Sequence, residues 1–228
     1  CSEELPSSKH LHPAREQQLS EGDDNDSQST VKEHIQLPQL LPEFTTGIKS
    51  SEYFCRLVGP IQTPSEEDIL EIITNILSGT LLVCSDGSFS SHSGTGTHAW
   101  VFSTAVGQIL LQGAGPIDCH PGQLSSYRPE LGGITVLLYI LTVIVKLGDI
   151  TMGRVKLYFD NQSFLDNVFD STPKRGIYPM LAVDYDLLVL SRDMLKALPI
   201  TITGEWVKGH YKGDNRQIQH DLNDLVDT

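Results

Sequence analysis

The chain has few basic residues and no apolar run that we expect to cross a bilayer. It contains 16 Lys and Arg against 29 Asp and Glu, a formal net charge of −13. This balance argues against a protein that coats nucleic acid through bulk electrostatics. The longest apolar stretch, residues 134–147, is short for a membrane helix and contains Lys146. With no recognisable signal peptide, we expect no membrane association and an intracellular location, in the cytoplasm or nucleus.

Cysteine is also scarce, and the four present, Cys1, Cys55, Cys84 and Cys119, match no zinc-binding spacing. Cys84 lies inside an apolar, strand-like run, so we expect a buried free thiol in a reducing compartment. The chain begins with Cys1 rather than Met, which suggests a fragment or a processed piece of a longer polyprotein.

The acidic charge is concentrated in the first third of the chain. Residues 1–79 hold 5 Lys and Arg against 14 Asp and Glu, whereas residues 80–228 hold 11 against 15. Residues 1–60 are rich in Ser, Glu, Asp, Gln and Pro, which predicts an acidic, largely disordered tether. Residues 61–79 predict a connecting amphipathic helix, because Ser65 and Asp68 form a capping box before a run of isoleucines at helical spacing.

The remainder, residues 80–228, alternates strand and helix patterns. We expect strands over 80–86, 97–104, 108–117, 155–160 and 200–210. Helices are expected from a cap at Ser125 or Ser126 to 147, then over 163–169, 178–198 and 220–227. The order predicts an α/β fold with a mixed five-stranded central sheet, its first three strands antiparallel, flanked by helices on both faces.

Four acidic residues stand at the ends of these elements. Asp86 and Asp160 end strand-like runs, Glu130 opens the long helix, and Asp227 closes the last one. Taken singly, each has an ordinary interpretation as a turn residue, a helix cap, a first-turn dipole partner or a surface charge. Taken together, converging carboxylates raise each other's pKa and are best neutralised by a pair of divalent ions. The pattern predicts metal-assisted phosphodiester hydrolysis, with Asp86 bridging the two ions.

The segments around these residues resemble ribonuclease H of type 1, in particular the domain carried by retroelement reverse transcriptases. The matching pieces lie within residues 80–228 and read SDGSF, SYRPELGGI, YFDNQS, GEWVKGH and NDLVD. The resemblance implies an RNase H-like fold and cleavage of the RNA strand of RNA–DNA hybrids by two Mg²⁺ ions, with Mn²⁺ able to substitute. It implies that Asp86, Glu130, Asp160 and Asp227 bind the metal. It also implies a polymerase domain as partner, on the same polyprotein.

Further roles follow from the same resemblance and from the residue types. His210, in a Gly-rich loop, is expected to assist proton transfer or product release. Trp206 is expected to be a core residue. The candidate nucleic-acid contacts are the backbone at Gly87 and Ser88, which would approach the RNA 2′-hydroxyl, and Asn161, Lys208, Lys212 and Arg216.

Two other functions remain open at this point. One is a hybrid-binding or scaffolding module that keeps the fold but is weakly active or inactive; the acidic balance and the lack of a strongly basic helix favour it. The other is a nuclease of related fold that acts on DNA, such as a resolvase or exonuclease. In addition, Pro129 directly precedes Glu130, and a helix that starts early would displace Glu130.

Overall fold

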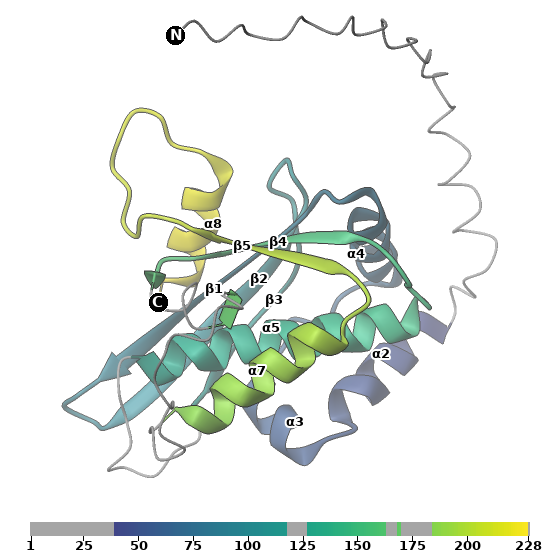
Figure 1. Cartoon of the computed structure of the whole chain (residues 1–228), viewed down its shortest axis with the longest axis horizontal. Helices are drawn as coiled ribbons and strands as arrows, with labels where there is room; N and C mark the ends of the chain where they lie inside the picture. The colour runs from purple at the N-terminus through teal and green to yellow at the C-terminus, as the bar shows by residue number, and fades with distance from the viewer. Residues whose placement is uncertain (1–38, 118–126, 163–167, 170–183, 228) are drawn as a thin grey trace, which may run out of the picture.

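The centre of the protein is a five-stranded sheet in the order β3-β2-β1-β4-β5 (Figure 1). The structure, a computed structural model, describes residues 39–117, 127–162, 168–169 and 184–227. β1 pairs antiparallel with β2, and β2 with β3, whereas β4 runs parallel to both β1 and β5. The predicted mixed sheet is therefore confirmed. Its strands are β1 Leu81–Ser90, β2 Thr95–Ser103, β3 Ile109–Pro116, β4 Arg154–Phe159 and β5 Thr201–Trp206.

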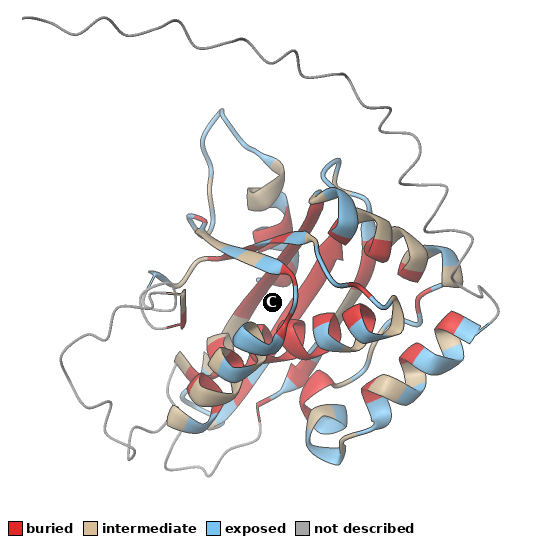
Figure 2. Ribbon diagram, turned by 45° about the vertical axis from the view of Figure 1, so that its right-hand side comes forward, coloured by how far each residue is buried: buried red, intermediate tan, exposed pale blue. Residues whose placement is uncertain are grey.

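Helices cover both faces of this sheet, as predicted. Alternate residues of a strand point to opposite faces, so Val83 faces the larger core while its neighbour Cys84 faces the smaller one. The larger core joins the sheet to five helices, and α8 covers the smaller core. Figure 2 shows the buried residues along the strands and on the helix sides that face them. The helices are α2 Leu40–Lys49, α3 Glu52–Val58, α4 Glu66–Ser78, α5 Tyr127–Leu147, α7 Tyr185–Ala197 and α8 Ile218–Val226.

α5 is the central helix of the larger core. It has 21 residues and is long and apolar enough to cross a membrane by length and composition, so judging the apolar stretch 134–147 alone underestimated it. However, 72% of its most apolar window is buried inside the protein. The expected stripe of Leu131, Ile134, Leu138, Leu141 and Val145 is buried, but so are most residues between them. α5 is therefore packed as a core helix, enclosed by the sheet and its neighbouring helices.

The prediction that residues 1–60 form a largely disordered tether is wrong for residues 40–58. Leu40, Phe44 and Ile48 recur at intervals of four residues, so α2 buries one apolar side against the core. In α3, Phe54 stacks on Tyr139 of α5 with ring centroids 3.8 Å apart. The acidic composition of residues 1–60 as a whole concealed these two short helices. Residues 1–38 lie outside the described part of the chain.

The connecting helix is confirmed as α4. The Ser65 side chain accepts from the Asp68 N–H at 3.1 Å, and the Asp68 carboxylate accepts from the Ser65 N–H at 2.8 Å. Its four isoleucines are buried. The expected cap at Ser125 or Ser126, most of the helix over 163–169 and the start of the helix over 178–198 lie outside the described residues.

Candidate active site

Asp86 and Asp160 lie side by side because of the way β1 and β4 end their pairing. The parallel ladder between these strands finishes at Cys84 and Tyr158. Each aspartate follows two residues later, so both stand on the same face of the sheet as the last pair, the face covered by α8. The sequence predicted that this strand ends at Asp86. In the structure β1 continues to Ser90 in a hairpin with β2. This pairing fixes the Asp86 backbone within an antiparallel ladder.

Glu130 reaches the same place from the first turn of α5. The described part of α5 begins at Tyr127, with Pro129 and Glu130 in its first turn. Glu130 is not displaced, because its carboxylate lies with those of Asp86 and Asp160. Gly87 of β1 seats this turn, because a Cβ at Gly87 would overlap with the Glu130 nitrogen and the Pro129 carbonyl carbon. The Gly87 N–H also donates to Asp86 Oδ1 at 2.7 Å. Gly87 therefore contacts both acidic residues, the Asp86 carboxylate through its N–H and the Glu130 backbone through its close approach.

Asp86, Glu130 and Asp160 form one cluster in which a carboxylate oxygen of each lies within 4.8 Å of the other two. Burial, with the charge of Asp160 next, raises the pKa of Asp86 to about 7. Burial and then Asp86 raise the pKa of Glu130 to about 9. Burial and then Asp227 raise the pKa of Asp160. Without a cation, the cluster therefore holds protons at neutral pH.

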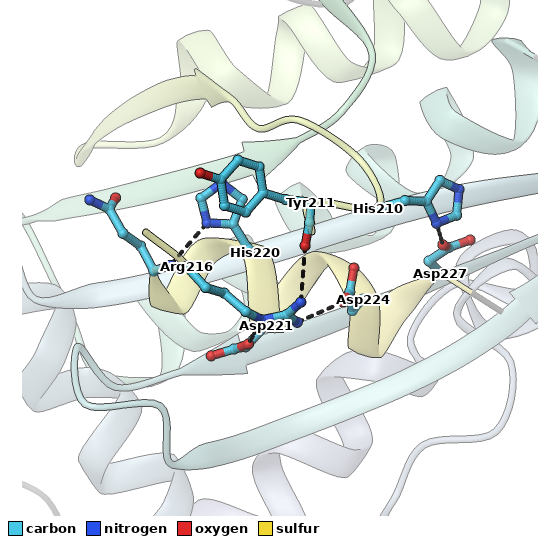
Figure 3. A network of polar contacts seen from close by, with 8 residues as sticks. His210, Tyr211, Arg216, His220, Asp221, Asp224 and Asp227 are labelled. Atoms are coloured by element: carbon cyan, nitrogen blue, oxygen red, sulfur yellow. Dashed lines mark hydrogen bonds and ion pairs between the residues drawn. The ribbon is translucent and has the colours of Figure 1, made fainter. Parts of the chain in front are cut away.

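Asp227 lies outside this group of three. It caps the C-terminal end of α8, and its Oδ2 lies 2.8 Å from Nδ1 of His210 (Figure 3). Its charge nevertheless raises the pKa of all three clustered carboxyls, so it faces the same centre from the margin. His210 is in the left-handed backbone region, with φ of 49°, and its side chain is 75% exposed. The structure therefore pairs His210 with Asp227 beside the cluster.

The loop that carries His210 is tied to α8 by polar contacts that the sequence did not reveal (Figure 3). Arg216 pairs with Asp221 and, at 2.6 Å, with Asp224, and it donates to the Tyr211 carbonyl. Tyr211 stacks on His220 with ring centroids 4.2 Å apart. Arg216, predicted as a phosphate contact, thus holds the loop on the helix. Of the other candidate contacts, Ser88, Lys208 and Lys212 are exposed, and Gly87 and Asn161 are half-buried.

Trp206 is not the core residue that the sequence suggested. β5 ends at this residue rather than continuing to 210, and its side chain is 47% exposed. The indole Nε1–H donates to the backbone carbonyl of Asp160 at 2.7 Å. β5 is an edge strand, so a side chain at its end has fewer neighbouring residues to cover it.

Two further residues beside the site escaped the sequence analysis. Arg128, in the first turn of α5, is buried and makes a bidentate pair with Asp186 of α7, both contacts at 2.8 Å. It clamps the turn that carries Glu130 to the neighbouring helix. His98, opposite Gly87 in the β1–β2 ladder, packs against Gly132 and Gly133 of α5, and burial lowers its pKa to about 4. The sequence motif contains Arg128, but it gives no sign of either residue's contacts, because these join elements that are distant in the chain.

The donor set suits a hard divalent cation. Carboxylate oxygens are the ligands that Mg²⁺ and Mn²⁺ take in proteins, and three converge here from a strand, a helix and a strand end. Burial and neighbouring carboxylates raise the pKa of Asp86 and of Glu130, and a cation bound between them would offset both effects. The three residues therefore fit at least one such ion, with Asp227 outside their group and paired with His210.

No protein-family model matches the chain, and no curated protein is significantly similar to it. Among solved structures, the chain is similar to the N-terminal RNase H domain of a Mycobacterium tuberculosis protein, at 18% identity and a TM-score of 0.39 over 64% of this chain and 94% of that one. It is similar to RNase H1 of Halobacterium salinarum, at 15% identity and a TM-score of 0.39 over 64% and 92%. It is also similar to LC11-RNase H1, solved in complex with an RNA/DNA hybrid, at 11% identity and a TM-score of 0.44 over 64% and 93%.

Proposed function

We propose that this chain is an endonuclease that hydrolyses the RNA strand of RNA–DNA hybrids, with two Mg²⁺ ions as cofactor and Mn²⁺ as a working substitute. The observation that carries the proposal is the convergence of Asp86, Glu130 and Asp160 within 4.8 Å. These three come from positions far apart in the sequence, and each belongs to a motif that resembles ribonuclease H. A purely structural role does not account for the arrangement, because buried carboxylates that repel one another destabilise the fold.

Asp86, Glu130 and Asp160 would hold the ions, with Asp227 contributing at the second position. When bound, the ions supply an activated water and stabilise charge on the attacking and leaving oxygens. His210 is suited to move a proton, since its ring is mostly exposed and Nδ1 is oriented by Asp227. The second ring nitrogen is then the one that exchanges a proton with the leaving oxygen or with solvent.

Recognition of the hybrid belongs to the residues that border the cluster. Ser88 is exposed and follows Asp86 and Gly87 in the chain, so its backbone suits a contact with the 2′-hydroxyl that distinguishes RNA from DNA. Lys208 and Lys212 flank His210 in the chain, are exposed, and suit contacts with phosphates. Asn161 follows the Asp160 ligand directly and suits a contact with sugar or phosphate. Arg216 contributes by holding the same loop on α8, unless a phosphate displaces its aspartates.

The biological setting also belongs to the proposal. We infer a reverse transcriptase of a retroelement, with the polymerase domain on the same polyprotein, residues 80–228 as the catalytic domain, and an intracellular location. Support comes from the sequence motifs DGS, Arg-x-Glu-Leu and Trp-Val-Lys-Gly-His. Among the described basic residues near the site, Arg216 is already engaged by Asp221 and Asp224, so a partner domain that adds affinity for the hybrid fits this setting.

The test is a cleavage assay with labelled substrates in Mg²⁺. RNA–DNA hybrid, duplex RNA and duplex DNA are compared for the unmodified chain, Asp86→Asn and the control Asp193→Asn, which changes an exposed carboxyl on α7. We expect cleavage of the RNA strand of the hybrid alone, lost in Asp86→Asn and kept in Asp193→Asn. Cleavage of duplex DNA would instead indicate the related-fold DNA nuclease, and activity unchanged by Asp86→Asn would refute the metal site.

One observation favours the alternative of a weakly active or inactive hybrid-binding module. Asp227 pairs with His210 and stands outside the three-carboxylate group, so the second ion is less well provided for. Calorimetric titration with Mg²⁺ separates the two functions. A scaffold binds the hybrid without any metal binding that depends on Asp86, whereas the nuclease loses metal binding in Asp86→Asn.

A further inference from the structure

The backbone at Asp160 lies just beyond the reach of the sheet. The last pair in the β4–β5 ladder joins Phe159 to Trp206, and the Val207 N–H donates to the Phe159 carbonyl at 2.9 Å. Asp160 follows this pair, so strand pairing no longer fixes its backbone. A carboxylate that is repelled by Asp86 and Glu130 would be free to turn away if nothing else held it.

Trp206 supplies a contact at this point. Its indole Nε1–H donates to the Asp160 carbonyl at 2.7 Å, a well-formed hydrogen bond, although the residue as a whole is 47% exposed. An indole usually satisfies its N–H where one edge is apolar and the other meets a polar group. Here that polar group is the backbone of a proposed metal ligand.

The chain beyond Trp206 then folds over the carboxylate of the same residue. Gly209 lies so close that a Cβ there would be 2.6 Å from Asp160 Oδ2. Asp160 is therefore held at its carbonyl by Trp206 and confined at its carboxylate by the Gly209 backbone. Both contacts come from one short segment, the one that continues into the His210 loop.

We propose that Trp206 is a positioning residue for Asp160, which orients the carboxylate toward the cluster by fixing its carbonyl. The inference rests on the proposed function only in taking Asp160 as a metal ligand. Groups that orient ligands from behind typically change metal affinity about 10- to 100-fold when removed. The exposed ring face offers a competing role, stacking on a base of the nucleic acid, which the same variants distinguish.

Three variants separate these roles. Trp206→Phe keeps an aromatic ring but removes the donor, Trp206→Ala removes both, and Gly209→Ala presses on the carboxylate while leaving the indole intact. Mn²⁺ affinity is measured by electron paramagnetic resonance without nucleic acid, so the readout is independent of cleavage. The matched control is Trp100→Phe, the other Trp of the chain, whose buried Nε1 has no hydrogen-bond partner among the described residues.

We expect Trp206→Phe and Trp206→Ala to weaken Mn²⁺ binding alike, by about 10-fold. Gly209→Ala should also lower the Mn²⁺ affinity, whereas Trp100→Phe should leave it unchanged. In cleavage, kcat should fall at fixed metal, recover at high metal, and leave KM for the hybrid unchanged. Normal Mn²⁺ affinity in both Trp206 variants would overturn the proposal. A raised KM in Trp206→Ala alone, with Trp206→Phe behaving as the unmodified chain, would assign stacking instead. Asp86→Asn serves as reference: if it binds Mn²⁺ normally, the proposed metal site itself fails.

Discussion

Replacing Asp86 with Asn should stabilise the metal-free protein at alkaline pH while it destroys the metal site. Burial and the neighbouring Asp160 raise the pKa of Asp86 from 3.8 to about 7. Between these two values the folded chain binds more protons at this carboxyl than the unfolded chain does. The free energy of unfolding therefore falls as pH rises through this window, and above pH 7 the folded state carries the full cost of the charge.

The magnitude follows from the size of the shift. One pKa unit corresponds to about 1.4 kcal/mol, so about three units correspond to about 4 kcal/mol at pH 8. Most of this cost comes from burial and the rest from the neighbouring carboxylates; water beside the cluster lowers it, which leaves about 2–4 kcal/mol. Asparagine has the shape of aspartate and keeps an oxygen for the Gly87 N–H, now at 2.7 Å from Asp86 Oδ1. The substitution thus removes the charge with little loss of packing.

The assay is urea unfolding in the presence of a chelator at pH 4, 6 and 8, with Asp193→Asn as a control for loss of an exposed carboxyl. Asp86→Asn should be more stable than the unmodified chain at pH 8, and the difference should shrink toward pH 4. A variant that is equally or less stable at pH 8 would refute the account of a repelling cluster. A difference that persists unchanged at pH 4 would show that its cause is not the charge.

Three further outcomes are expected. Mg²⁺ affinity should rise from pH 6 to pH 8, because binding must release the protons retained by the raised pKa values of Asp86 and Glu130; calorimetry in buffers of different ionisation heat counts them. Gly87→Ala should cost about 1–3 kcal/mol of stability and weaken metal binding, since its Cβ meets the α5 backbone, whereas the control Gly148→Ala meets only side-chain carbons, at 3.1 Å or more. Arg128→Met should lower the free energy of unfolding by about 1.5–3 kcal/mol in thermal or urea unfolding, because the bidentate contact between buried Arg128 and the exposed Asp186 is lost. No loss would show that the pair is not needed.

The sequence predicted the fold and the three clustered carboxylates for a physical reason. Asp86 and Asp160 follow apolar strand runs and Glu130 opens an apolar helix, so element ends could be located from patterns of burial. Parallel strands place their carboxyl ends at one edge of the sheet, which brings such residues together. The average composition of residues 1–60 did not predict the helices within residues 40–58, because the acidic residues around them dominate that average.

The contacts that the sequence did not predict are those between distant elements of the fold. Trp206 is exposed because β5 is an edge strand, and no local pattern distinguishes an edge strand from a central one in so short a segment. The engagement of Arg216 with Asp221 and Asp224 depends on how the preceding loop returns to α8. Asp227 was expected among the metal ligands. It is the C-cap of α8 and lies outside the group of Asp86, Glu130 and Asp160.

The site is held together through the backbone rather than by opposite charge. β1 pairing fixes Asp86, the close approach at Gly87 fixes the turn that carries Glu130, and Trp206 donates to the carbonyl of Asp160. His210 partly lowers the pKa of Asp86 and Asp160, but its side chain is mostly exposed and its charge is screened. A cluster preorganised in this way keeps its carboxylates close despite their repulsion. Among the described residues, His210 neutralises the cluster only in part, and a divalent ion at the proposed site would supply the remaining positive charge.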